Sequence, residues 1–437
     1  MIPLALALCL LQDPVSLKAG FAEEDITPEP GTRKCGWNSL VYGRRVLDPL
    51  FARAAVFESG GGRAGFIALD VLFVHRDTTA EIRRRVQERT GFPAEALLVA
   101  ATHNHAGPAV EADLYPREDA YVERMIDRAA EAFVRAWQGR REAEIGLAGV
   151  FEWNVAYNRR VLYRNGTVRC HGSFRDPDAL AFEGPVDPEV AVLAARSKEG
   201  APLGAIVNFA CHPCHHGGDD AFSAGYPGQL ALALKEKGWP VALFLQGAAG
   251  NLHHNDPSGV NKEKTMAECG RVLASAAEKA IGLMKFRPAA RLSARSRTIE
   301  LPYRAYTEAD LRGTARGAQR FGEPGFYDKT MPALLEEIRR KNGKEPAEVQ
   351  ALFLDEFAYV AVPAEYFVEY GLRIKEETYP VRTRVVGYAN GMVGYVPHRE
   401  AFRRGGYEVT FGIRSKLAPE AGDLLAETAI ELVKSRK

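Results

Sequence analysis

The chain has 437 residues, of which 46% are hydrophobic and 26% charged, and its formal net charge is +1. A chain of this length buries a large apolar core, and its near-zero charge provides no global attraction to nucleic acid or to an anionic membrane surface. The sequence also lacks a clustered basic face, an aromatic-rich RNA-binding pattern and a heptad repeat. We therefore expect a globular protein that does not bind nucleic acid.

The N-terminus opens with a nearly unbroken apolar run, residues 1–11. This run is too short to cross a membrane but has the length of the apolar part of a secretory signal. No basic residue precedes it and residues 12–14 (QDP) make a poor cleavage region, so a mis-assigned start or a buried N-terminal strand is the alternative. We expect a signal peptide over residues 1–17, an exported (periplasmic or secreted) protein, and no transmembrane segment in the mature chain.

Apolar runs and helical patterns alternate through the first part of the chain. The expected elements are a core strand at 65–74, a helix at 77–90 capped by Asp77 or Thr78, a strand at 96–101 and a long amphipathic helix at 118–141. Strands that alternate with helices in this way predict a parallel or mixed sheet with helices on its faces.

The same alternation recurs later in the chain. Strands are expected at 203–209, 241–245, 292–303, 349–363 and 384–389, and helices at 228–237, 262–284 and 422–434, with a polar helical insert at 307–342. Residues 146–185 hold many aromatics and no long helical pattern, so we expect loops and hairpins over a sheet edge. No flexible linker divides the chain, and we predict one large α/β domain over residues 18–437, with mixed β-sheets flanked by helices.

Three short segments carry residues typical of a metal site. They are residues 101–108 (ATHNHAGP), 208–213 (NFACHP) and 362–365 (VPAE), and each follows an apolar run expected to be a buried strand. Strand ends are where α/β enzymes gather ligands. Two neutral imidazoles and a carboxylate suit zinc, with a fourth position left for water or substrate. The pattern predicts a metal-dependent hydrolase with its site at the strand ends.

Each of these residues also has a purely structural interpretation. A single histidine after a strand is more often a hydrogen-bonded core residue, but His103 and His105 share one face of an extended segment, which favours a site. Glu365 precedes the apolar run of a helix, where a helix dipole by itself favours a glutamate. His253 lies in a glycine-rich loop, residues 246–255 (QGAAGNLHHN), and is either a proton shuttle, a ligand or a solvated loop residue.

The segment around His212 allows two further alternatives. Cys211, Cys214 and His215 together form a Cys-x-x-Cys-His pattern, which is the signature of c-type haem attachment. The cysteines directly follow an expected core strand, which leaves no room for haem. A redox pair or disulfide between Cys211 and Cys214 is the other alternative.

Taken together, the segments resemble the neutral/alkaline (non-lysosomal) ceramidase family, in particular its N-terminal catalytic domain. Five blocks carry the resemblance in the same order: residues 20–28 (GFAEEDITP) with Gly36, residues 102–108, residues 208–213, residues 245–251 (LQGAAGN), and residues 363–365 with 390–395 (NGMVGY).

The resemblance implies a zinc-dependent hydrolase that cleaves the amide bond of an N-acyl lipid, as in sphingolipid metabolism. It implies that zinc is bound by His103, His212, Glu365 and Tyr395. It further implies that His105 and Arg159 contact the reacting amide or the zinc-bound water. Without the resemblance, Tyr395 is expected to be a buried hydrogen-bonding phenol.

The chain differs from the family at two points. Residues 250–255 (GNLHHN) carry His253 where ceramidases have a serine proposed as the nucleophile, and the chain ends soon after the catalytic domain, without a C-terminal β-sandwich. Both differences point away from ceramide itself. We expect zinc-activated water to cleave an amide, with His105 as general acid or base, Arg159 or Tyr395 facing the oxyanion, and His253 as a candidate proton carrier. The alternatives are another ester, lactone or N-acyl substrate, or an inactive binding protein of the same fold.

Overall fold

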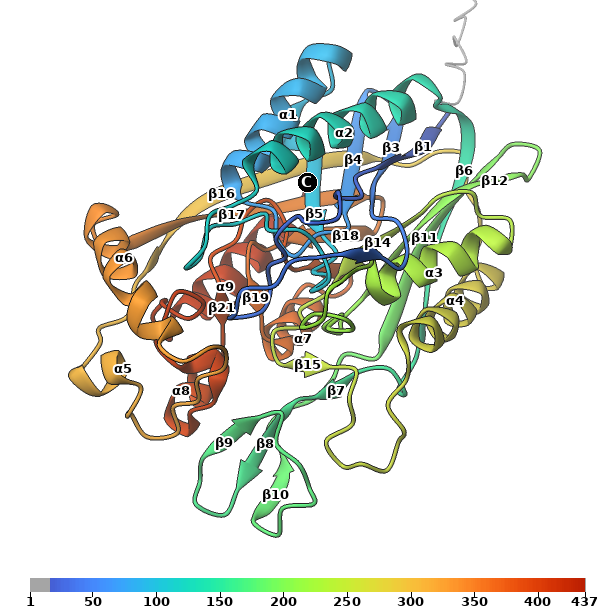
Figure 1. The fold of residues 1–437 in the computed structure, drawn as a ribbon. Coiled ribbons are helices and arrows are strands. Elements are labelled where there is room, and N and C mark those ends of the chain that lie inside the picture. Colours follow the sequence, from blue (N-terminus) through green and yellow to red (C-terminus); the bar gives the residue numbers. More distant parts are fainter. Residues whose placement is uncertain (1–15, 437) are drawn as a thin grey trace, which may run out of the picture.

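The computed structural model describes residues 16–436 (Figure 1). Residues 1–15, most of the expected signal peptide and Cys9 with it, lie outside the described residues, so the signal peptide and export stay predictions. Among residues 16–436, no helix combines the length and the apolar character that crossing a bilayer requires.

The larger of the two main sheets has eight strands in the order β14-β12-β11-β6-β1-β3-β4-β5. Most neighbours are antiparallel, but β4 pairs with β5 and β12 pairs with β14 in parallel. The strands are β1 (Lys18–Asp25), β3 (Phe51–Ser59), β4 (Gly62–Leu69), β5 (Leu97–Ala101), β6 (Arg141–Phe151), β11 (Glu189–Ser197), β12 (Pro202–Phe209) and β14 (Ala242–Gln246).

Local sequence explains why both pairings occur in one sheet. β3 and β4 form a hairpin because Gly60 and Gly61 both adopt positive φ, 59° and 81°, which a two-residue turn of this kind requires. Parallel strands instead need a long crossover. Helix α1 (Arg76–Thr90) connects β4 to β5, and α3 (Gly225–Glu236) connects β12 to β14.

A second sheet of four strands runs in the order β16-β17-β18-β20. Its strands are β16 (Leu292–Pro302), β17 (Lys344–Leu354), β18 (Phe357–Ala361) and β20 (Arg382–Val386), and α7 (Val368–Glu377) connects the parallel pair β18 and β20. The two sheets pack face to face, with the ring of Phe66 on β4 lying 5.2 Å from that of Tyr359 on β18. Both side chains belong to one buried apolar cluster.

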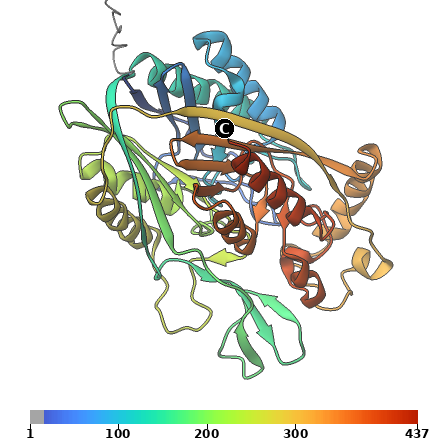
Figure 2. The ribbon, with the colours of Figure 1, turned by 180° about the vertical axis from the view of Figure 1, so that it is seen from behind.

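Helices cover the outer face of each sheet. On the larger sheet lie α1 and α3 with α2 (Asp119–Gln138) and α4 (Met266–Gly282), and on the smaller sheet lie α7 and α9 (Ala421–Lys434), which Figure 2 shows from behind. In α2, Tyr121, Met125, Ala129 and Phe133 recur every fourth residue and are buried, as expected of a helix with one apolar face. The predicted α/β class, with mixed sheets flanked by helices, is confirmed.

The remaining strands and α-helices lie in the segments that connect these elements, and the longest of them is α6 with 15 residues. They are β2 (Arg45–Val46), β7 (Tyr157–Asn158), β8 (Arg160–Tyr163), β9 (Val168–Cys170), β10 (Ala179–Phe182), β13 (Ala221–Phe222), β15 (Leu252–His253), β19 (Glu365–Tyr366), β21 (Tyr395–Val396), α5 (Glu308–Arg312), α6 (Phe326–Arg340) and α8 (Arg399–Arg404). Strands β8, β9 and β10 form the small sheet expected within residues 146–185.

Four expected elements differ from the structure. The strand expected at 65–74 is β4, which begins at Gly62 and ends at Leu69, five residues early. Residues 349–363 form parts of two strands, β17 and β18, because the chain reverses at Asp355, whose φ is 51°. Helix α4 begins four residues later than expected, because Thr265 and Glu268 form a capping box there. The predicted cap of α1 by Asp77 or Thr78 is wrong, since the N-cap is His75 and it makes no side-chain hydrogen bond to the helix.

Replacing Phe66 tests the shared core of the two sheets. Phe66 is 0% exposed, so Phe66→Ala leaves a cavity between the sheets and is expected to lower the free energy of unfolding by about 3–5 kcal/mol. Urea unfolding followed by circular dichroism measures this change. Val260→Ala, at a residue that is 84% exposed, is the control and should change stability by less than about 0.5 kcal/mol. Equal stability of the two variants would contradict the shared core.

Candidate metal centre

The centre forms where several strands of both sheets end. His103 follows β5 by two residues, His212 follows β12 by three, and Glu365 follows β18 by four. Each of these strands is one partner of a parallel pair, and the carboxyl ends of parallel strands meet at one edge of a sheet. Three segments that are far apart in sequence are thereby joined at one place.

The nitrogen atoms of three histidines, two of them buried and His105 half-buried, converge on one point. The Nε2 atom of His103 lies 2.9 Å from Nε2 of His212 and 3.1 Å from Nε2 of His105. The Oε2 atom of Glu365 lies 3.4 Å from Nε2 of His103 and 3.3 Å from Nε2 of His212. Within residues 16–436, these histidines are the one trio of histidine, cysteine or acidic residues whose ligand atoms lie within 4.8 Å of one another.

The opposite ring nitrogen of each histidine is held by a backbone carbonyl. The Nδ1 atoms of His103, His105 and His212 lie 3.1, 2.9 and 2.8 Å from carbonyl oxygens, which belong to Leu72, Gly36 and Ala249. A carbonyl oxygen only accepts, so each Nδ1 carries the hydrogen and each neutral ring keeps a bare lone pair on Nε2. Metal-binding histidines are held in the same way in many proteins.

Electrostatics favour a cation between these atoms. Burial lowers the pKa of all three histidines, that of His105 to about 3, so the rings are neutral. Their lone pairs therefore face one another and repel. Burial also raises the pKa of Glu365 to about 7, and its Oε2 atom has no hydrogen-bond partner among the described residues. Three imidazole nitrogens and a carboxylate oxygen are a donor set that zinc and similar transition metals prefer.

The backbone at His103 differs from the sequence-based expectation. The extended segment predicted for His103 and His105 is wrong, because His103 adopts the left-handed region with a φ of 63°. Asn104 nevertheless points away from the centre, donating to the carbonyl of Asp70 and accepting from the backbone N–H of Ala106. Such strained backbone is found at functional sites that the surrounding structure fixes firmly.

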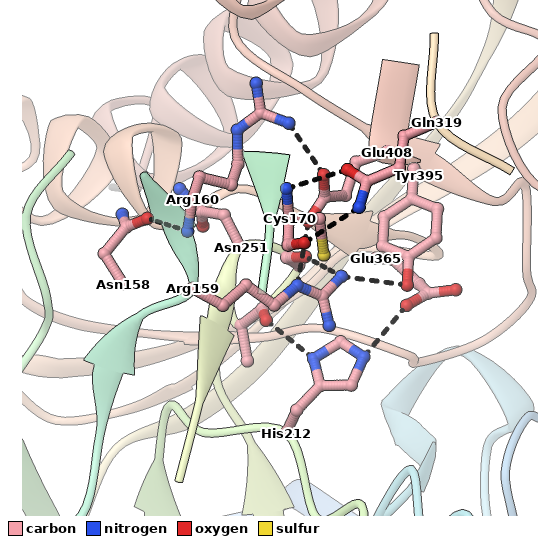
Figure 3. Close-up of polar contacts among 12 residues, drawn as sticks. Asn158, Arg159, Arg160, Cys170, His212, Asn251, Gln319, Glu365, Tyr395 and Glu408 are labelled. Atoms are coloured by element: carbon pink, nitrogen blue, oxygen red, sulfur yellow. Dashed lines mark hydrogen bonds and ion pairs between the residues drawn. The ribbon is translucent and has the colours of Figure 1, made fainter. Parts of the chain in front are cut away.

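Tyr395 and Arg159 border the centre beside Glu365 (Figure 3). Strands β19 and β21 pair in parallel with Glu365 opposite Tyr395. The Nη2 atom of Arg159 donates to the Tyr395 hydroxyl at 3.1 Å and to the Gly250 carbonyl at 2.8 Å. Burial raises the pKa of Tyr395 well above its usual value. A guanidinium and a phenol thus offer N–H and O–H donors next to the converging nitrogens.

Glu408 fixes the position of Arg159, and no sequence pattern identified it. Its two carboxylate oxygens accept from Nε of Arg159 at 2.8 Å and from Nη1 of Arg160 at 2.6 Å. Burial on its own raises the pKa of Glu408, but the two guanidinium groups outweigh burial and lower it to about 2. The one sequence feature that pointed to such a residue is the pair of consecutive arginines at 159 and 160. Two arginines that are buried together require a buried carboxylate to balance their charge.

His253 does not belong to the converging trio. It lies on β15, and its ring contacts those of His171 and His254, with centroids 4.7 and 4.1 Å away. The catalytic role expected for His253 therefore stays a prediction. The alternative of a Cys211–Cys214 disulfide is wrong, because both thiols are free.

Comparisons with known proteins support the motif-based resemblance. No protein-family model matches the chain. Neutral ceramidase from Pseudomonas aeruginosa is 25% identical to it over 269 residues, which is 58% of this chain and 39% of that protein. The chain thus matches less than half the length of this curated relative.

Two solved structures share the fold. The crystal structure of neutral ceramidase from Pseudomonas aeruginosa has a TM-score of 0.75 and 20% identity, over 97% of this chain and 75% of that one. A ceramidase complexed with C2 has the same TM-score and identity, over 96% of this chain and 76% of that one. The predicted resemblance to neutral ceramidases is confirmed in sequence and in fold.

The buried ion pairs of Glu408 predict a pH-dependent stability. The folded-state pKa of about 2 lies below the ordinary value of 4.5, so the carboxylate stabilises the fold above pH 4.5, and this stabilisation disappears as the pH falls through 2. Glu408→Gln is expected to lower the free energy of unfolding at pH 7 by about 3 kcal/mol. Urea unfolding at pH 7, 5 and 3 should reveal a deficit that shrinks at pH 3.

Glu400→Gln, at an exposed residue of α8, is the matched control and should follow the unaltered protein at each pH. A deficit of Glu408→Gln that is equal at all three pH values would contradict the predicted coupling.

Proposed function

We propose that this chain is a zinc-dependent hydrolase that cleaves the amide bond of an N-acyl substrate. The observation that carries the proposal is the convergence of three bare imidazole nitrogens, two of which lie 3.4 and 3.3 Å from the buried Oε2 atom of Glu365. The resemblance to neutral ceramidase supports an amide rather than an ester or lactone as the reacting group.

In this proposal, zinc is held by His103, His212, Glu365 and Tyr395. The residues fit a metal because the Nδ1–H groups of His103 and His212 are already bonded to carbonyls, which leaves only Nε2 free to bind one. Zinc, when bound, polarises a carbonyl and lowers the pKa of a water molecule from about 15.7 to about 7. A bound zinc ion would offset the repulsion between the lone pairs of His103 and His212.

The protein's own groups complete the reaction. His105 presents Nε2 as a bare acceptor because its Nδ1 donates to Gly36, so it orients the attacking water and takes up its proton. Passing that proton to the nitrogen of the departing amine completes the cleavage. Arg159 donates hydrogen bonds to the oxyanion that develops on the former carbonyl oxygen.

Water is the nucleophile in this scheme because a histidine occupies the position of the family serine. His253 cannot form the ester intermediate that a serine hydroxyl allows, and its ring lies in a different cluster from His103. An attack by water requires only an acceptor for its proton, which His105 provides.

Removing a metal ligand tests the proposal directly. The protein is expected to bind about one zinc per chain and to hydrolyse N-acyl substrates, and His103→Ala and His212→Ala should lose both the metal and more than 99% of the activity. Elemental analysis and an amidase assay measure the two quantities. His398→Asn is the control, because asparagine also caps α8 and His398 lies outside the centre. Activity that survives a chelator would overturn the proposal, and bound zinc without turnover would indicate a binding protein.

Arg159 offers a second test that separates catalysis from metal binding. Arg159→Met removes one oxyanion donor and is expected to lower kcat by about 100- to 1000-fold, with bound zinc unchanged and KM altered much less. Glu408 stays paired with Arg160 in this variant, so the fold should persist. Steady-state kinetics and elemental analysis give the answer, and an unchanged kcat would exclude the role assigned to Arg159.

A further inference from the structure

Four histidines form a continuous row beside the metal centre, and we call this row the imidazole array. Neighbouring ring centroids lie 3.8 Å apart for His215 and His254, 4.1 Å for His254 and His253, and 4.7 Å for His253 and His171. The array lines an open cavity of about 1020 Å³, together with Trp37, Cys214, Asn255 and residues 262–267.

The segments that build the metal centre also build the array. His215 is three residues beyond His212 on the same loop, and His253 is four residues beyond Ala249, whose carbonyl holds His212. The backbone N–H of His171 donates to the carbonyl of Arg159 at 2.8 Å. A substrate whose amide lies at the metal centre therefore has the neighbouring part of its structure within reach of the array.

The array contains polar atoms that no group among residues 16–436 satisfies. Both ring nitrogens of His254, Nδ1 of His215 and Oδ1 of Asn255 are buried without a hydrogen-bond partner among the described residues. Each such atom costs the free energy of a lost hydrogen bond, so four at one place indicate a ligand. His215 donates through Nε2 to the carbonyl of Lys264, so its Nδ1 is an acceptor. His254 offers one donor and one acceptor.

Charge argues against an anion as the occupant. Burial lowers the pKa of all four histidines, so the array is neutral. Lys262 and Lys264 also line the cavity, but the carboxylate of Glu263 lies 3.9 Å from Nδ1 of His254 and repels an anion there. Stacked rings direct their nitrogens side by side rather than at one point, and within residues 16–436 the array supplies no trio of converging ligand atoms. A metal ion is therefore also disfavoured.

We infer that the imidazole array binds an uncharged, polyhydroxylated head group on the amine side of the substrate, of the amino-sugar class. Hydroxyl groups both donate and accept, which matches the mixture of unpaired donors and acceptors in the array. The ring of Trp37, 46% exposed at the cavity edge, offers a face for the C–H side of a sugar ring. This inference rests on the proposed function, since it names the class of amide that the centre cleaves.

A panel of amides with one octanoyl chain tests the inference on the zinc-loaded protein. The amines are glucosamine, a long-chain amino diol and butylamine, which carry many, two and no hydroxyl groups. We expect kcat/KM to be at least about tenfold higher for the glucosamine amide than for the butylamine amide. A higher kcat/KM for the amino-diol amide than for the glucosamine amide would identify a sphingoid head group and overturn the inference. Equal values for glucosamine and butylamine, or a preference for butylamine, would overturn the inference.

Variants then assign the preference to the array. His254→Phe keeps a ring between His215 and His253 but removes both nitrogens, and it should reduce the glucosamine-to-butylamine ratio of kcat/KM about tenfold or more. Lys279→Met, at an exposed residue of α4 outside the cavity, is the control and should leave the ratio unchanged. Lys262→Met, at an exposed residue of the cavity edge, tests for a charge contribution to head-group binding. A ratio that falls only in Lys262→Met would identify an anionic head group and overturn the inference. Loss of a second zinc in His254→Phe would identify a metal site and overturn it too.

A failure of the proposed function can be distinguished from a failure of this inference. If the zinc-loaded protein cleaves no member of the panel, the proposed function is wrong, and the array is tested by calorimetric titration with N-acetylglucosamine. Binding that His254→Phe weakens at least about tenfold supports the array as a polyol site. Absence of binding to the unaltered protein overturns the inference independently of catalysis.

Discussion

The candidate centre depends on one repeated interaction, a hydrogen bond from a histidine Nδ1 to a backbone carbonyl. Leu72, Gly36 and Ala249 each hold one ring of the trio in this way. The bond fixes both the tautomer and the ring direction, so that every Nε2 presents a lone pair to the same point. Because carbonyls in loops next to strand ends are themselves fixed by the sheets, the rigidity of the fold extends to the converging nitrogens.

The layered architecture explains why those carbonyls and histidines meet. The two main sheets are mostly antiparallel, and their strands run in parallel only where a helix connects them. The strands β5, β12 and β18 each belong to such a parallel pair. Their carboxyl ends point to one side of the molecule, where the short strands β19 and β21 bring Glu365 opposite Tyr395. Face-to-face packing of the two sheets holds these ends at a constant separation.

A network of buried charges surrounds the centre and sets its electrostatics. Arg159 and Arg160 share the carboxylate of Glu408, and Arg160 also pairs with Glu183. Both arginines remain charged in the interior. The guanidinium of Arg159 therefore faces Tyr395 as a permanent cation, and its ion pair with Glu408 fixes its orientation. The neighbouring imidazole array is neutral, so the cationic and the neutral surfaces of the site lie side by side and suit different parts of one substrate.

The sequence by itself determined the fold class and most helices, and the short motifs ATHNHAGP and VPAE singled out His103, His105 and Glu365, because apolar periodicity and such motifs are local signals. It did not reveal that His103 is left-handed or that Glu408 supports Arg159. The hairpin of β17 and β18 was missed because a turn at Asp355 leaves an apolar run unbroken. Only the tertiary structure decided these features, since each arises from contacts between segments more than a hundred residues apart or from a backbone conformation that side-chain patterns do not encode.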